Sequence, residues 1–192
     1  MPTPPPPAAL SALAAELCEA LSLYGRALTE PCDRCITDVS ECLRRTASLT
    51  ADTHSRLLTL FCPSLPRAPG VVLCERLYAA VQQVFRASML LPASHRPDAR
   101  LLTEAQGLCR MGELLRREID ALPRLAKGKS DALPDTYAYH AELTRVRAAI
   151  AMHVLHGNCS SEARLLYDGT SDVAQALSEA YTALLALVAE TV

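Results

Sequence analysis

Residues 32–62 read CDRCITDVSECLRRTASLTADTHSRLLTLFC, and these thirty-one residues contain neither proline nor glycine. Apolar and small side chains recur there at steps of three and four residues, which places them on one face of an α-helix. A half-buried strand would need strict alternation, and the stretch shows none. We therefore predict that 32–62 forms the longest helix and the spine of a helical bundle. Cap-forming side chains around Leu49 leave a break or kink at that point open.

Prolines and glycines divide the remaining sequence into further helical stretches. Toward the N-terminus, residues 8–29 carry an apolar stripe, and residues 1–7 form a proline-rich lead that we expect to be disordered. Toward the C-terminus, the same criteria predict helices over 71–91, 97–122, 134–156 and 160–167, and a last helix from Ser171. The sequence thus predicts an all-α fold, with a single domain over 8–192 made of about five to seven mostly antiparallel helices.

Glycines and small residues mark two of the later helices. Gly107 and Gly112 each lower the helix propensity of the predicted fourth helix by ~1 kcal/mol, and we expect the close approach of a neighbouring helix to offset this loss. Gly169 is expected to separate the short helix from the last one. The apolar stripe of the predicted fifth helix includes Tyr137, Ala141, Thr144, Ala148, Ala151 and Leu155.

Composition argues against several classes of function. The 19 basic and 21 acidic residues leave a net charge of −2, which provides no positive field for nucleic acid. The chain has no run of 18 apolar residues, and its start lacks the basic and apolar regions of a secretory signal, so we expect no membrane span and no secretion. With ample apolar residues for a core, the eight cysteines are interpreted as thiols in a reducing compartment, cytoplasmic or nuclear.

The sharpest chemical pattern is the pair Cys32 and Cys35. His153 and His156 share one helical face, and the four residues would form a Cys₂His₂ zinc site if the fold brought them together. A redox pair would need a βαβ context, which is absent. Cys35 also falls on the apolar face of the predicted spine, where cysteine packs as a small hydrophobe. Core packing is the interpretation that we favour, with neither metal nor cofactor expected.

No pattern in the sequence predicts catalysis. The five histidines are scattered, and the chain has neither a phosphate-binding glycine loop nor a histidine pair of the metalloprotease type. We therefore predict that the protein is not an enzyme. A cluster of basic residues is interspersed with carboxylates and is interpreted as a solvated charged face; it consists of Arg116, Arg117, Arg124, Lys127 and Lys129.

The surplus of apolar helix faces favours a non-catalytic scaffold or adaptor subunit that binds protein partners, including a second copy of itself, within a larger assembly. We expect the first helix to contribute because the lead lets it reach a partner, and the last because its seam is nearly heptad. The predicted contact residues are Leu13, Leu17, Leu21, Leu177, Leu184 and Leu187. The alternative is a bundle that binds a small molecule or zinc around Cys32, Cys35, His153 and His156.

Overall fold

The computed structural model describes residues 6–29, 33–59, 65–91, 99–128, 134–156 and 160–191. Most of the predicted disordered lead, residues 1–5, lies outside this part of the chain. The last two residues of that lead, Pro6 and Pro7, already belong to the first helix. Within the predicted loop at 123–134, residues 129–133 also lie outside the described part.

The described chain is all-helical. Its helices are α1 (Pro6–Thr29), α2 (Asp33–Thr59), α3 (Arg67–Met89), α4 (Ala99–Leu125), α5 (Thr136–His156) and α6 (Ser161–Thr191). These six helices, with no strand among the described residues, confirm the predicted all-α bundle of five to seven helices.

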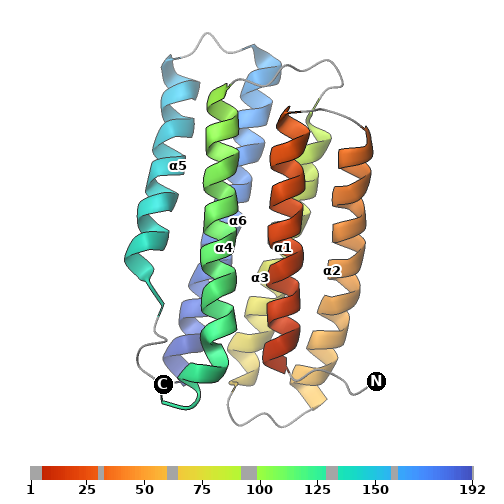
Figure 1. Ribbon diagram of the computed structural model, residues 1–192, viewed down its shortest axis with the longest axis vertical. Helices are drawn as coiled ribbons and strands as arrows, with labels where there is room; N and C mark the ends of the chain where they lie inside the picture. The colour runs from red at the N-terminus through yellow and green to blue at the C-terminus, as the bar shows by residue number, and fades with distance from the viewer. Residues whose placement is uncertain are drawn as a thin grey trace.

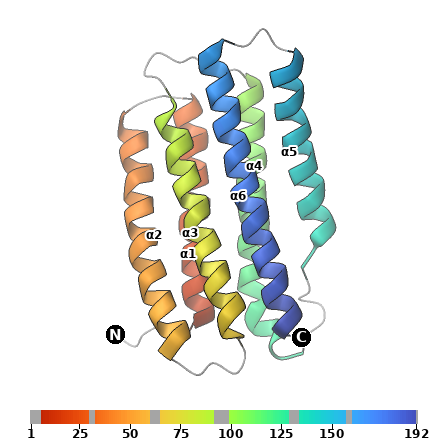
Figure 2. The same ribbon diagram turned by 180° about the vertical axis from the view of Figure 1, so that it is seen from behind.

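The bundle is built from two three-helix halves with consecutive helices running in opposite directions (Figure 1). In the first half α2 packs against α1 and α3, and in the second α5 packs against α4 and α6. The halves join where α1 lies against α4 and where α3 lies against α6, a pairing that is seen from behind in Figure 2. The inner helices are therefore α1, α3, α4 and α6, whereas α2 and α5 lie on opposite outer sides.

The core fills the space between the inner helices, and a hydrogen bond between two buried hydroxyls crosses it. The Tyr24 hydroxyl of α1 lies 2.8 Å from the Thr170 hydroxyl of α6. Because Thr170 already donates to the Leu166 carbonyl at 2.7 Å, the Tyr24 O–H donates to Thr170. This arrangement satisfies both buried hydroxyls, as a close-packed interior requires.

The predicted spine is an outer helix. The helix α2 is continuous through Leu49, without the break that the sequence left open. Among the described helices it contacts α1 and α3 but not the other three. The longest described helix is instead α6, with 31 residues. The physical reason is the number of apolar faces: α2 has one and must turn its charged side to water, whereas α6 buries side chains against several neighbours.

The glycines act mainly through close helix contacts. The chain continues as one helix through Gly169, so the predicted break there was wrong; an added Cβ at this residue would lie 2.9 Å from Cδ1 of Leu90, the residue that follows α3. At Gly112, the added Cβ would lie 2.6 Å from Leu21 Cδ1 of α1. Together with the crowding at Gly107 described below, this contact confirms that the glycines of α4 permit the close approach of neighbours.

Candidate interaction surface

A tyrosine pair holds one end of α5 to the bundle. The rings of Tyr139 and Tyr181 stack with centroids 3.7 Å apart and planes within 4° of parallel. The Tyr139 hydroxyl donates a 2.7 Å hydrogen bond to the carbonyl of Leu177 on α6. Burial raises the pKa of both phenols, that of Tyr181 to about 12, so both are neutral and the contact is one of packing.

An ionic cluster joins α5 to α4. The guanidinium of Arg145 lies 2.9 Å from Glu142 Oε1 and 3.7 Å from Glu104 Oε2. From α4, Arg110 Nη2 approaches Glu142 Oε1 to 2.8 Å. Gly107 provides the space for this arrangement, because an added Cβ would lie 2.3 Å from Arg145 Nη2. The contact between α4 and α5 is thus partly ionic.

The pKa values of the two carboxylates in this cluster, Glu104 and Glu142, are shifted in opposite directions. Burial raises the pKa of Glu104, and the nearby Arg145 and His153 only partly offset this effect. Burial would also raise the pKa of Glu142, but hydrogen bonds from Arg145 and Arg110 outweigh it and lower the pKa overall. In its charged form Glu104 therefore destabilises the fold, whereas charged Glu142 stabilises it.

Replacing Glu104 by methionine should stabilise the protein at neutral pH. Glu104 is 3% exposed, and its Oε2 has no hydrogen-bond partner among the described residues, so the change removes a penalty of about 1–3 kcal/mol. Because the folded-state pKa is raised, the wild type gains stability as pH falls through that pKa, and the advantage of Glu104→Met should shrink by pH 4. Urea unfolding at pH 7 and pH 4 measures both effects.

Glu142→Met provides the matched control for this prediction. The folded-state pKa of Glu142 is lowered, so its contribution is present above the unfolded pKa and is lost as pH falls through the folded pKa. We expect Glu142→Met to destabilise the protein at pH 7 and to differ little from the wild type in strong acid. A destabilised Glu104→Met variant at pH 7 would contradict the assigned burial penalty.

The outward face of α5 carries an uncharged stripe of mostly small and apolar residues, flanked by the exposed His140 and Arg147. This stripe is the one noted in the sequence, here called the α5 seam: Tyr137, Ala141, Thr144, Ala148, Ala151 and Leu155. At the two ends of the seam, Tyr137 is 84% exposed and Leu155 is 75% exposed; Met152, close to Leu155 along the helix, is 55% exposed. The helix packs instead through the opposite side, which carries Tyr139, Leu143, Val146 and Ile150. An exposed helix face normally carries charged side chains, so the α5 seam is unpartnered apolar surface.

The equivalent outer helix, α2, shows the ordinary pattern. Most of its exposed positions carry charged or hydroxyl side chains: Arg34, Thr37, Ser40, Glu41, Arg44, Ser48, Asp52, Ser55 and Thr59. The exposed Ala51 and Leu58 are the apolar exceptions. Both outer helices cover two inner helices of their own half, and α5 packs less closely against its neighbours than α2 does. The outer face of α2 thus has the polar side chains expected of a helix surface in water, whereas the α5 seam does not.

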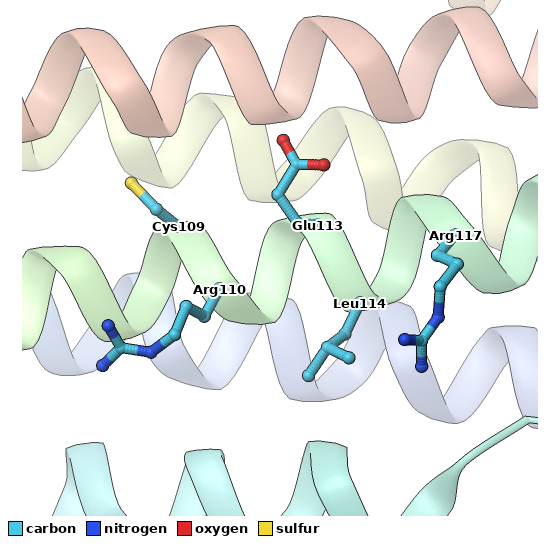
Figure 3. A pocket seen from close by; sticks show the side chains of 5 residues that line it. All are labelled: Cys109, Arg110, Glu113, Leu114 and Arg117. Carbon is cyan, nitrogen blue, oxygen red and sulfur yellow. The ribbon is translucent and has the colours of Figure 1, made fainter.

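A shallow groove runs along the outer side of α4. Its lining residues are Cys109, Arg110, Glu113, Leu114 and Arg117, and its volume is about 630 Å³. In Figure 3 all five side chains come from α4, with the α1 ribbon on one side and α5 on the other. Burial raises the pKa of the Cys109 thiol, so this cysteine is not an activated nucleophile.

Two members of the alternative zinc set, Cys35 and His153, lie on helices that do not touch. Cys35 is buried on α2 and His153 lies on α5, and the inner helices separate these two. His153 instead packs near the ring of Tyr167, with centroids 5.4 Å apart. Cys32 and the side chain of His156 lie outside the described part. No group of three or more metal-ligating side chains occurs within the described residues.

The six leucines predicted to contact a partner line the core instead. Leu13, Leu17 and Leu21 of α1, and Leu177, Leu184 and Leu187 of α6, are at most 1% exposed. Both helices lie inside the bundle, so their seams are covered by the chain's own helices. A partner cannot reach these leucines on the folded protein, which moves the candidate surface to α5.

The basic cluster around the end of α4 is largely paired. Arg116 lies 3.8 Å from Asp120, and Arg117 lies 3.0 Å from Glu118. Lys127 is exposed, and Lys129 lies outside the described residues. This pairing agrees with the interpretation as a solvated charged face.

No protein-family model matches the chain, and a comparison with curated proteins finds no match. The segment Pro7–Thr29 of α1 is long and apolar enough to cross a membrane by length and composition. Half of that segment is buried in the bundle, and the core helix of a soluble protein passes the same test. The expectations about membrane, compartment and catalysis therefore stay predictions.

Proposed function

We propose that the protein is a non-catalytic scaffold or adaptor that binds the helix of a protein partner on the α5 seam. The observation that carries this proposal is the contrast between the two outer helices: α2 presents charges to water, and α5 presents an uncharged apolar stripe. Burying such a stripe against an amphipathic helix is a common mode of recognition, with anchors repeating at steps of three and four residues.

The attachment of α5 suits this role. Stacked tyrosines and an ionic cluster fix the helix from its inner side, so the outer side is available without rearranging the core. Small side chains at Ala141, Ala148 and Ala151 permit a close approach of the partner's backbone, and Tyr137 and Leu155 provide larger contacts at the two ends.

The test is affinity capture of the tagged chain from its source cells with two matched variants. Ala148→Arg places a long charged side chain in the α5 seam, and Ala51→Arg places the same side chain on the exposed face of α2. We expect Ala148→Arg to reduce partner recovery by about tenfold or more and Ala51→Arg to leave it unchanged. Both alanines are exposed, so thermal melting should be unaffected in each variant. Equal recovery by the two variants, or recovery of the chain alone, would overturn the proposal.

A second candidate function is small-molecule binding in the α4 groove. Its volume falls within the range of about 300–1,000 Å³ that ligand pockets occupy. The groove supports this function less well, because its lining comes from one helix and three of its five side chains are charged. Ligand sites ordinarily enclose their ligand with mostly apolar residues from several elements.

A further inference from the structure

Glu104 is a buried carboxyl at the contact between α4 and α5. Its side chain is 3% exposed, and Oε2 has no hydrogen-bond partner within the part of the chain that the structure describes. Helix α5 covers this face of α4, because Gly107, three residues further along, is crowded by Arg145 and Val146. If α5 moved away, the Glu104 carboxyl would return to water.

The arginine beside Glu104 is engaged by another carboxylate. Arg145 Nη2 lies 2.9 Å from Glu142 Oε1, whereas Arg145 Nη1 stops 3.7 Å from Glu104 Oε2, which is too far for a hydrogen bond. The docked position of α5 thus satisfies Glu142 and leaves Glu104 buried without a close partner.

Charged and titratable groups reach this cluster from every helix that packs on α4. The strongest electrostatic influences on the Glu104 carboxyl come from α5 and from α4 itself: Arg145, His153, Glu142 and Arg110. From α6, the ring of Tyr167 packs near that of His153. On α1, the basic residue of the last turn, Arg26, is exposed. Together these groups offset the burial of Glu104 only in part.

Helix α5 is the easiest of the six to open. It packs least extensively against the rest of the described bundle, and a helix with few buried contacts separates at low cost. Tyr139 fixes its first turns to α6, whereas Glu104 faces its second half, at Arg145 and His153. The buried carboxyl therefore acts on the end of α5 that the tyrosine stack does not hold.

We propose that ionisation of Glu104 releases the second half of α5: this segment stays docked on α4 while the carboxyl is protonated and opens more often once it is charged. Opening from this end exposes Val146 and Ile150, which the docked helix buries. The pH of the solution then sets whether α5 offers one apolar face or two. This behaviour belongs to the chain alone and does not depend on what binds the α5 seam.

The direction of the pH effect follows from the two states of the carboxyl. Burial under α5 raises the pKa of Glu104 above its ordinary value of 4.5, to which the pKa returns when α5 opens. The docked helix therefore binds the proton more tightly than the open one. Docking is strongest below the ordinary pKa and weakens as pH rises through the raised pKa.

Amide hydrogen exchange at pH 5 and pH 7.5, corrected for the intrinsic exchange rate at each pH, measures the opening of every helix. In the wild type, we expect residues 145–156 to open about fivefold or more often at pH 7.5 than at pH 5. Opening of α2, the other outer helix, should change by less than about twofold.

Three variants assign the effect to Glu104. Glu104→Gln keeps the shape of the protonated carboxyl, and Glu104→Met needs no hydrogen bond. Both should hold α5 closed at pH 7.5 and remove the pH dependence of its opening. His153→Gln is the matched control, because it removes the other titratable group beside Glu104 and should retain most of the pH dependence.

The inference is overturned if wild-type α5 opens equally at both pH values, or if the pH dependence survives in both Glu104 variants. Loss of the pH dependence in His153→Gln alone would assign it to the histidine and would also overturn the inference. An equal response of α2 would show that Glu104 acts on the whole bundle and not on α5, with the same consequence.

Discussion

Replacing Leu184 by aspartate should prevent the protein from folding. Leu184 is completely buried on α6, among the inner helices of the bundle. The substitution removes about 2–5 kcal/mol of apolar packing and places a carboxylate where it has no solvent, which costs several kcal/mol more. A domain of this kind is stabilised by about 5–15 kcal/mol in total, so little or no folded protein should remain. Circular dichroism during heating should show no cooperative transition.

Ala186→Asp is the matched control for this prediction. Ala186 lies on the same helix two residues away, and its side chain is exposed. The carboxylate then stays in water, and the melting temperature should remain within a few degrees of the wild-type value. A Leu184→Asp variant that melts like the wild type would contradict the buried position of α6 and restore Leu184 as a surface contact.

Replacing Tyr139 by alanine should release α5 while the rest of the bundle stays folded. The ring is 1% exposed, and its stacking on Tyr181 and hydrogen bond to Leu177 fix one end of the helix. Loss of a buried aromatic costs about 3–5 kcal/mol. Because α5 is the helix with the smallest contacts in its half, we expect this cost to appear as local opening. Amide hydrogen exchange in α5 should accelerate by about 10²–10³-fold, and exchange in α1, α2 and α3 should change little.

The variant Tyr139→Phe separates the contribution of the hydroxyl group from that of the aromatic ring. This variant keeps the stack and loses only the hydrogen bond to Leu177, a change of about 0.5–1.5 kcal/mol. Exchange in α5 should accelerate by about tenfold or less. If amide exchange in the Tyr139→Ala variant accelerated equally in all six helices, α5 would open only together with the whole bundle. That result would contradict the prediction of local opening.

The predicted apolar stripe of α5 shows what such a pattern can establish. The spacing of Tyr137, Ala141, Thr144 and Ala148 was visible in the sequence, and an apolar stripe ordinarily marks the buried face. The helix carries a second stripe, through Tyr139, Leu143, Val146 and Ile150, with larger side chains that fill the space against α4 and α6. Two stripes on one helix are two candidates for the buried face. The sequence alone does not say which of them is the chain's own core.

The fold class and most helix bounds were predictable because they depend on local chemistry. Prolines at the connections, apolar spacing and the glycines of α4 act within a few residues or through direct packing, and α1, α2 and α5 follow the predicted ranges closely. The helix through Gly169 was not predicted because the close contact that favours glycine there comes from Leu90, at the end of α3 and far away along the chain. Likewise, a C-x-x-C pair and a histidine pair are readable as motifs, but the distance between them depends on the bundle.

Local patterns along the chain were enough to predict a bundle of apolar-faced helices and to mark two possible pairs of metal ligands far apart in the sequence. The tertiary structure decided which faces meet: it buried the leucines of α1 and α6, separated Cys35 from His153, and left the α5 seam in water. The physical reason is that local spacing sets the shape of each helix, whereas burial depends on the competition among all apolar faces of the chain for a limited interior.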